Sequence, residues 1–363
     1  MGLPLLLYEL FMVLIFLFLV GLALRRERPV YNSMPKYRPR VLVMVPCKGM
    51  DIQLSRNLAS LRAQDYKNFE AVAIVDSLKD EAVGEIRKAG MAVMVTSPRF
   101  ARGSGKVNAI SSAISANKGY DIYVIADSDI HVQKDWLSLL VAPLSDKAVG
   151  ISTTYPYFRP VAGFWSRVKS VWSFVGEGLM ESSLTRFGWG GSLAFKASIL
   201  AGKRLALFSR CVSDDIPITN MAKVMGYGIA YVKAAQPVVD TNDDLPTFWE
   251  WSNRQTAFSV LGFSRIFGYG MVFYTAQVLL FISSLVLAAA VSGWFLVLLI
   301  PFLAGVYRTY QRARERRLQS ALIYVLINFI YLANLLVAVR MKEVRWRGKT
   351  YGITHLSKLK NGL

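Results

Sequence analysis

The sequence predicts an α/β protein that combines a doubly wound, mostly parallel sheet domain with transmembrane helices at the N-terminus and in the C-terminal third. Two observations carry this prediction. Short apolar runs alternate with helical patterns between residues 40 and 135, an order that is typical of parallel sheets. Apolar stretches of membrane-spanning length stand near both ends of a 363-residue chain that is 53% hydrophobic.

The segment between residues 40 and 135 supplies the expected sheet and its covering helices. Strands are predicted at 41–45, 70–75, 91–96 and 122–126, and helices at 54–63, 80–89 and 107–117. Open sheets of this kind bind ligands beyond the carboxyl ends of their strands. Polar residues that directly follow a predicted strand are therefore the first candidates for a functional site.

Acidic residues stand at two of these strand ends. Asp127 and Asp129 follow the strand at 122–126, and Asp76 follows the strand at 70–75. Carboxylates at i and i+2 on an extended chain point the same way, and Mg²⁺ is typically held by one or two carboxylates plus substrate phosphates. A solvated acidic turn is the alternative for Asp127-Ser-Asp129 alone, but a second acidic strand end on the same edge favours a single site.

Two further segments could contribute to that site. Lys106, in the run Gly103-Ser-Gly-Lys106, opens a predicted helix beside glycines, where an anion is favoured, although the full P-loop pattern is absent. Asp214 and Asp215 precede a helix that is expected to begin near Pro217. They could cap that helix, or one of them could face the metal site as a catalytic base.

Four apolar segments are long enough to be considered as membrane spans. The first, Leu3–Leu24, is followed by Arg25-Arg-Glu-Arg28, which places its C-terminal side in the cytoplasm by the positive-inside rule and does not fit a cleaved signal peptide. The number of later spans and the side of the C-terminus stay open, because counting spans and counting basic residues disagree. The later candidates are Met271–Ala290, Trp294–Tyr307 with its preceding residues, and Ala321–Val339.

A Trp-bearing apolar stripe precedes these later spans. Its residues recur at spacings of four and three beside basic side chains, which suits a helix that lies in the headgroup plane. A helix that faces a protein core shows the same spacing. Residues 247–267 repeat the pattern. The stripe consists of Val161, Trp165, Val168, Trp172, Val175 and Leu179.

The charge of the chain suits a membrane surface better than nucleic acid. Lys and Arg number 43 against 24 Asp and Glu, which gives a net charge of +19, and many basic residues flank apolar segments. No zinc-ligand or RNA-binding signature accompanies them. With only two cysteines and two histidines, a disulfide framework, a histidine metal site and a Ser/His/Asp triad are not expected.

The order of these motifs resembles the family-2-type inverting glycosyltransferases of GT-A fold, and most closely the ceramide glucosyltransferase branch. The resemblance covers nearly the whole chain, including its apolar segments. It rests on the acidic and Lys106 motifs, on Ser213-Asp214-Asp215 and Trp251-Ser-Asn-Arg254-Gln255, and on Val45-Pro-Cys-Lys-Gly-Met-Asp51, Gly188-Trp-Gly-Gly-Ser192 and Val344-Arg-Trp-Arg-Gly-Lys-Thr-Tyr351.

The resemblance implies a role for each candidate residue. Asp129, with Asp127, would bind a Mg²⁺ or Mn²⁺ cofactor. Asp215 would be the catalytic base, next to Asp214, and Arg254 would assist the diphosphate. The nucleotide sugar would be bound by Asp76, Lys106, Asn108 and Asp127.

Three departures from the family pattern leave parts of this assignment open. The branch's Glu-Asp pair is Asp214-Asp215 here, which keeps the charge but shortens one side chain. The family's QxxRW motif keeps only its arginine, Arg254, so the identity of the acceptor is in doubt. Asp76 is followed by Ser77 instead of a second aspartate, which leaves Asp80 as a weaker candidate at that strand end.

The resemblance implies a membrane-embedded enzyme that transfers a hexose from a UDP-sugar, such as UDP-glucose, to a lipid hydroxyl, with no nucleic-acid partner. The alternatives are transfer to polyprenyl (dolichyl) phosphate, a processive polysaccharide synthase and a non-catalytic basic membrane scaffold. The expected organisation is an anchor at 1–28, a cytoplasmic catalytic domain at 29–246 with an interfacial region at 158–187, an interfacial helix at 247–268, transmembrane helices at 269–341 and a basic tail at 342–363.

Overall fold

The computed structural model describes residues 3–24, 37–262 and 265–353, and the chain divides into two compact units. The unit that we call the sheet unit comprises residues 28–162, 175–242 and 342–363. The helical unit comprises residues 1–27, 163–174 and 243–341. Each unit is described by itself below.

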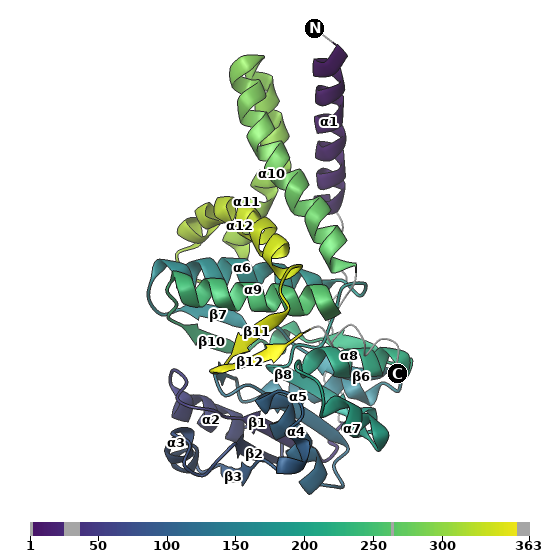
Figure 1. Ribbon diagram of the computed structural model, residues 1–363, viewed down its shortest axis with the longest axis vertical. Helices are drawn as coiled ribbons and strands as arrows, with labels where there is room; N and C mark the ends of the chain where they lie inside the picture. Colours follow the sequence, from purple (N-terminus) through teal and green to yellow (C-terminus); the bar gives the residue numbers. More distant parts are fainter. Residues whose placement is uncertain (1–2, 25–36, 263–264, 354–363) are drawn as a thin grey trace. The chain divides into compact units, whose positions relative to one another are not determined.

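The sheet unit is built on a seven-stranded, mostly parallel sheet with the order β3-β2-β1-β4-β8-β6-β9 (Figure 1). Strands β1 to β4 are parallel to one another, whereas β8 runs antiparallel to both of its neighbours, β4 and β6. The predicted fold class is confirmed. The strands are β1 Val41–Pro46, β2 Phe69–Val75, β3 Ala92–Val95, β4 Ile122–Ala126, β6 Val149–Thr153, β8 Ser192–Lys196 and β9 Gly228–Tyr231.

Helices cover this sheet as expected for a doubly wound fold. Apolar side chains of α4, α7 and α8 pack against one face of β1, β2, β4 and β8 in a single buried cluster. The seven strands and helices predicted between residues 40 and 135 are all present, with ends that differ by at most two residues. The helices are α2 Leu54–Arg62, α3 Ala82–Lys88, α4 Gly105–Ala116, α5 Trp136–Val141, α7 Lys203–Phe208 and α8 Asp215–Val224, with short 3-10 turns at 98–100, 142–145, 197–200 and 233–235.

Two smaller sheets complete the sheet unit. Strands β5 Ile130–His131, β10 Val238–Thr241 and β7 Tyr157–Pro160 form one of them. The other is a hairpin of β11 Glu343–Trp346 and β12 Lys349–Gly352, whose turn residues Arg347 and Gly348 both have positive φ. A two-residue turn of this kind matches the twist of the strands that it joins. The segment predicted as a basic tail therefore begins with an ordered hairpin.

The helical unit contains the apolar segments. Among the described residues, four helices are long and apolar enough to cross a membrane, at 3–21, 266–290, 293–312 and 317–338. Helices α1 and α10 pack side by side through Met12, Leu19 and Leu280 (Figure 1). The elements are α1 Leu3–Leu24, α9 Leu245–Gly262, α10 Ile266–Ala290, the 3-10 segment η5 Gly293–Leu299, α11 Ile300–Arg312, α12 Arg317–Ala338 and the first part of α6 Phe164–Glu181.

Three residues of the predicted Trp stripe, Trp165, Val168 and Trp172, belong to the helical unit. Trp172 of α6 is buried, stacks on Tyr331 of α12 with ring centroids 4.8 Å apart, and donates its indole N–H to Asn334 Oδ1 at 3.0 Å. Val168 is fully buried as well. This burial favours the core-facing alternative for these side chains, because the pattern records one apolar face and not what covers it. The predicted helix at 247–267 is wrong in extent: α9 ends at Gly262, and a new helix begins at Ile266.

Candidate active site

Lys106 is the centre of the polar site in the sheet unit. It lies in the first turn of α4, which begins after Ser104, whose Oγ accepts a hydrogen bond from the N–H of Val107 at 3.2 Å. Lys106 Nζ lies 2.7 Å from Asp127 Oδ1 and 3.0 Å from Asp214 Oδ2. One ammonium group therefore joins the end of β4 to the start of α8.

The Gly188–Ser192 motif makes this arrangement sterically possible. Its carbonyl groups hold both partners in place, since Gly190 O accepts a bond from Lys106 Nζ at 3.2 Å and Gly191 O accepts one from the N–H of Asp127 at 3.0 Å. A Cβ atom added at Gly190 would lie 2.2 Å from Asp214 Oδ2. Position 190 therefore has to be a glycine if Asp214 is to reach Lys106.

Burial and charge act against each other in this cluster. Burial favours the neutral form of Lys106, but the carboxylates of Asp127 and Asp214 outweigh it and raise the pKa of Lys106. Burial raises the pKa of Asp127, and the negative charge of Asp214 adds to the rise while Lys106 opposes it. Because removal of one partner leaves an uncompensated buried charge, Lys106 is needed to offset the charge of Asp127, with which it forms an ion pair.

Asp215 differs from its neighbour Asp214 in its bonding. Its Oδ1 accepts hydrogen bonds from the N–H of Ile216 at 2.8 Å and from the hydroxyl of Ser213. Burial, followed by the charge of Asp214, raises the pKa of Asp215 to about 6. Asp214 precedes α8 but makes no side-chain capping bond. Asp214 is thus held by its ion pair with Lys106, whereas Asp215 has a pKa that is raised toward neutral pH.

Asp76 and Asp80 lie at the end of β2 with different surroundings. Asp76 Oδ2 is 2.8 Å from Lys48 Nζ and 3.9 Å from Lys349 Nζ, and its side chain is about one third exposed. Asp80 Oδ1 accepts N–H bonds from Gly49 at 2.9 Å and Ala82 at 3.0 Å. Asp80 therefore fixes the loop after β1, whereas Asp76 is paired with lysines.

Asn108 and Arg254 make contacts of a different kind. Asn108 is buried in α4, where its Oδ1 accepts a bond from the hydroxyl of Ser112 at 3.3 Å. Arg254 belongs to the helical unit, on α9, where its guanidinium lies 3.8 Å from Glu250 Oε1. Their nucleotide and diphosphate roles remain predictions.

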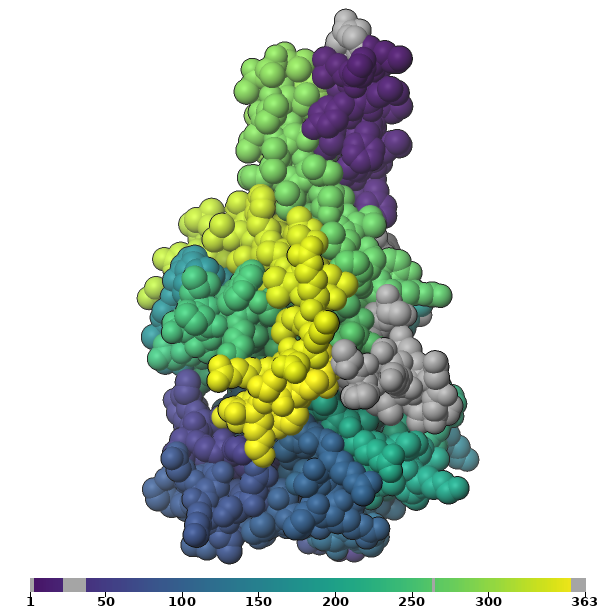
Figure 2. Space-filling model, in the orientation of Figure 1, coloured from purple at the N-terminus to yellow at the C-terminus, as the bar shows by residue number. Residues whose placement is uncertain are grey.

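The structure adds charged residues that the sequence did not single out. Asp51, in the loop after β1, accepts a bond from the Ser128 hydroxyl at 2.5 Å and one from Arg347 Nη2 of the C-terminal hairpin, also at 2.5 Å. Tyr351 of the same hairpin accepts a bond from the N–H of Gly105 at 3.4 Å. Asp51, Arg347 and Tyr351 all stand in segments that the family resemblance uses, which was the available signal. Figure 2 shows the hairpin, at the yellow end of the colour scale, on the surface of the sheet unit.

The carboxylates at the end of β4 fit a hard divalent cation that is completed by substrate. The described residues contain no group of three or more His, Cys, Asp or Glu side chains that could hold an ion. Asp127 and Asp129 offer two carboxylates on one short loop. Such a set suits Mg²⁺ or Mn²⁺ only when phosphate oxygens and water supply the other ligands.

Comparison with known proteins places the chain in a family. The sequence model of glycosyl transferase family 21 matches residues 6–358. The chain belongs to this family. The predicted glycosyltransferase is thereby confirmed at the level of the family, while the ceramide glucosyltransferase branch remains a prediction.

Solved structures of two glycosyltransferases resemble this chain to different degrees. A mannosyltransferase from Pyrobaculum calidifontis, solved with GDP-Man and Mn²⁺, matches with a TM-score of 0.53 and 20% identity over 90% of this chain and 93% of its own. The glucosyl-3-phosphoglycerate synthase from Mycobacterium tuberculosis, solved with Mn²⁺, UDP and phosphoglyceric acid, matches with a TM-score of 0.43 and 16% identity over 62% of this chain and 78% of its own. The first of these likenesses bears out the predicted GT-A architecture.

Proposed function

We propose that this family 21 chain is a membrane-embedded, metal-dependent inverting glycosyltransferase that moves a hexose from a nucleotide sugar to a lipid hydroxyl. The observation that carries the proposal is the Lys106 cluster. It brings the end of β4, with its metal-binding candidates, together with the Asp214–Asp215 pair. A donor site and a candidate base are thus parts of one polar cluster.

The donor would be held by charge. Asp129 and Asp127 would bind Mg²⁺ or Mn²⁺, which neutralises the diphosphate as it leaves. Mn²⁺ and GDP-Man in the structure of the related mannosyltransferase support this choice of cofactor and donor class. Asp76, at the end of β2, is about one third exposed and can accept hydrogen bonds from the nucleotide base.

Asp215 would act on the acceptor. The acceptor hydroxyl oxygen forms a bond to C1 of the sugar, the bond from C1 to the diphosphate oxygen breaks, and the hydroxyl proton passes to Asp215. A base works best when its pKa lies near the operating pH. Burial raises the pKa of Asp215 to about 6, so the carboxylate is mostly ionised at neutral pH and still binds a proton.

A lipid acceptor is supported by the helical unit. Four of its helices are long and apolar enough to cross a membrane, and an acceptor that lies in a bilayer needs an enzyme that lies there too. Arg254 on α9, carried by this unit, is proposed to assist the diphosphate, because a guanidinium can bind phosphate oxygens in pairs. The cytoplasmic location of the sheet unit is part of the proposal and rests on the basic residues after α1.

The proposal is tested by reconstituting the purified protein with membrane lipid extract and labelled UDP- and GDP-hexoses, and by identifying the product by mass. We expect a hexosyl lipid with inverted anomeric configuration and loss of product in Asp215→Asn. Asp135→Asn is the control, because it makes the same change at the start of another helix, α5, outside the Lys106 cluster. A sugar on polyprenyl phosphate, made at an undiminished rate by Asp215→Asn, would contradict the proposed acceptor, since a phosphate needs little base.

A further inference from the structure

The C-terminal hairpin places a cationic tip among the acidic groups of the sheet unit. Arg347, in the turn between β11 and β12, lies on Asp51 at 2.5 Å, and Lys349 lies 3.9 Å from Asp76. Tyr351 accepts a bond from Gly105 at the start of α4. The hairpin thus contacts the loop after β1, the loop after β2 and the first residue of α4.

The hairpin is held firmly enough to position its tip. Four residue pairs form its ladder, and the N–H of Ile353 bonds to Lys342 O at 2.9 Å beyond its open end. Val344 and Ile353 are buried, with exposed fractions of 1% and 0%. The tip residue Arg347 keeps 44% of its side chain exposed. The anchored strands and the accessible guanidinium together suit a ligand contact.

The partner of Arg347 connects it directly to the metal-binding candidates. One oxygen of Asp51 receives Arg347, and the other receives the hydroxyl of Ser128, the residue between Asp127 and Asp129. Asp127 and Asp129 also interact electrostatically with Arg347. A planar guanidinium beside a carboxylate is in the geometry that also suits two phosphate oxygens.

We propose that Arg347 is a binding residue for the nucleoside diphosphate, and that phosphate oxygens replace the Asp51 carboxylate as its partner when the donor enters. Lys349 adds a second positive charge on the same hairpin. The inference rests on the proposed function, because it assigns a further residue to the same donor site. It also gives the hairpin, which follows α12 after four residues, a role in the sheet unit.

The competing explanation is that Arg347 only neutralises the buried Asp51. The two explanations differ in what Asp51→Asn does. If phosphate competes with Asp51 for the guanidinium, Asp51→Asn keeps or tightens the binding of a diphosphate. If the ion pair is only a structural tie, Asp51→Asn and Arg347→Gln weaken binding alike.

The experiment is calorimetric titration of UDP, GDP and UMP in the presence of Mn²⁺ into the full-length protein. Arg347→Gln should weaken binding of the diphosphate about tenfold or more and binding of UMP much less. Arg347→Lys should bind the diphosphate more tightly than Arg347→Gln but less tightly than the wild type. Arg345→Gln, which removes the same charge from β11, is the control and should bind like the wild type. Equal affinity of wild type and Arg347→Gln, or parallel loss in Asp51→Asn, would overturn the inference. Absence of nucleotide binding in the wild type would instead contradict the proposed function.

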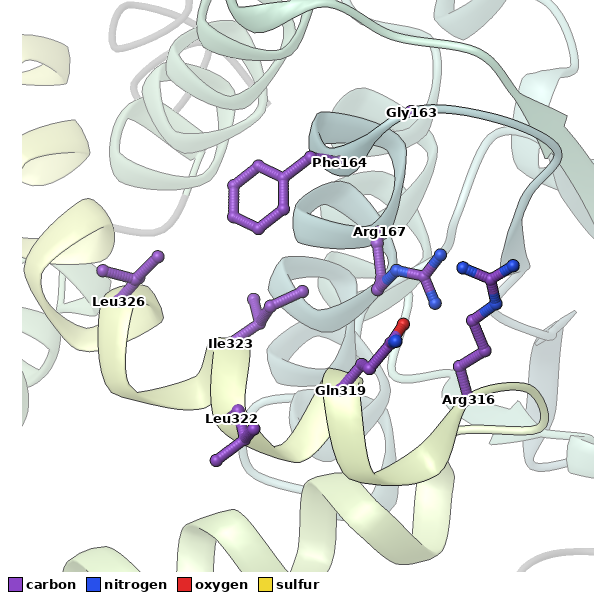
Figure 3. Close-up of a pocket in the computed structure, with 8 residues that line it drawn as sticks. All are labelled: Gly163, Phe164, Arg167, Arg316, Gln319, Leu322, Ile323 and Leu326. Carbon is purple, nitrogen blue, oxygen red and sulfur yellow. The ribbon is translucent and has the colours of Figure 1, made fainter.

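A different observation in the helical unit carries a second inference. A pocket of about 580 Å³ is lined at one end by two arginines, Arg167 of α6 and Arg316 at the start of α12, and the guanidinium groups lie side by side (Figure 3). Among the residues that the structure describes, no carboxylate forms an ion pair with either of them. Apolar side chains line the rest: Phe164, Leu322, Ile323 and Leu326.

The lining has a charged end and an apolar side, as a phospholipid has a headgroup and acyl chains. Gln319, Ile323 and Leu326 stand at i, i+4 and i+7 and therefore form one stripe along α12, a helix long and apolar enough to cross a membrane. Arg316 directly precedes that helix, and the guanidinium of Arg167, on α6, lies beside that of Arg316, where a headgroup phosphate would lie next to an acyl chain on the stripe. We infer that this pocket binds one anionic phospholipid, with its phosphate on Arg167 and Arg316.

The inference is tested by measuring the melting temperature of the detergent-solubilised protein with added phosphatidylglycerol, phosphatidylcholine or inorganic phosphate. Phosphatidylglycerol should raise the melting temperature of the wild type, and the rise should disappear in the double variant Arg167→Gln/Arg316→Gln. A control double variant, Arg265→Gln/Arg340→Gln, removes the same charge elsewhere in the helical unit and should keep the rise. An equal rise with phosphatidylcholine or phosphate alone, or a rise that survives in the pocket variant, would overturn the inference.

Discussion

Two polar clusters, one in each unit, differ in charge. In the sheet unit, polar groups near the strand ends are charged and paired: Lys106 with Asp127 and Asp214, and Arg347 with Asp51. In the helical unit, Asn334 of α12 instead accepts a bond from Trp172 and donates to Asn253 Oδ1 at 2.8 Å and Ser252 Oγ at 3.2 Å. These groups are neutral, and each bond joins α12 to α6 or α9.

This difference in charge suggests different roles: the charged cluster serves ligand binding and chemistry, and the neutral cluster serves the packing of helices. A buried charge costs free energy unless a partner offsets it, so a cluster of ion pairs is a weak way to stabilise a fold. It is, however, a way to keep charged groups ready for a charged ligand. Neutral hydrogen bonds between helices cost less and can fix their packing in an apolar environment. Changes in the first cluster should therefore affect turnover, and changes in the second should affect stability.

The largest expected effect is loss of the metal. If the carboxylates after β4 serve donor binding, EDTA should abolish transfer, Mg²⁺ or Mn²⁺ should restore it, and Asp129→Ala should be inactive while its melting temperature stays near that of the wild type. The reason is that the departing diphosphate needs charge neutralisation. Transfer assays at fixed free metal concentration measure this. Full activity in chelator would show that these carboxylates bind no essential ion.

The next effect is that of the base. Asp215→Asn removes the proton acceptor and should lower turnover by roughly 10²-fold or more, with nucleotide affinity unchanged because the side chain acts on the acceptor. Single-turnover assays and UDP titrations on the same sample separate the two quantities. A larger loss for Asp214→Asn than for Asp215→Asn would reverse their assignment. Asp214 is paired with Lys106 instead, so we expect Asp214→Asn to lower turnover less than Asp215→Asn does.

A pH profile tests the same residue without mutation. Burial and the charge of Asp214 raise the pKa of Asp215 to about 6, and only the ionised carboxylate accepts a proton. Activity should therefore be full above this pKa and decline as the pH falls through it, by about tenfold for each further pH unit at acidic pH. The dependence of kcat/KM on pH, with donor binding measured in parallel, checks this. A flat profile from pH 7 to pH 5 would exclude Asp215 as the base.

Local patterns predicted the scaffold of this protein well. The strand at 122–126 and the helix at 3–24 have the predicted bounds, because continuous apolar runs of those lengths have few alternative structures. The acidic candidates at the ends of β2 and β4 follow from the same strands, since side chains after parallel strands meet at one edge. The sequence predicts Lys106 at the start of a helix, where it could bind an anion. Its two carboxylate partners, Asp127 and Asp214, could be identified only from the tertiary structure.

Other features could not be read from the chain. The hairpin at 343–352 has strands of only four residues each, so the alternation of Val344 and Trp346 with arginines is too short to mark a strand in the sequence. The Trp stripe of α6 indicated one apolar face but not that α9 and α12 cover it. Helical periodicity is the same whether lipid or protein contacts a face. Asp51 carries no local signal, because its role depends on Ser128 and Arg347, which are remote in sequence.

The smallest expected effect lies in the helical unit and completes the comparison. Trp172→Phe removes the indole donor to Asn334, and Asn334→Leu removes the acceptor together with two further bonds. Bonds of this kind between membrane helices contribute about 0.6 kcal/mol on average and up to about 1.7 kcal/mol. We expect the double-mutant cycle to give a coupling in that range for the free energy of unfolding, measured by denaturation in mixed micelles. UDP affinity should stay unchanged in all three variants, because none of them alters the sheet unit. A coupling near zero would show that the bond does not stabilise the packing of α6 on α12. Loss of UDP binding in the folded variants would contradict the division of roles between the two units.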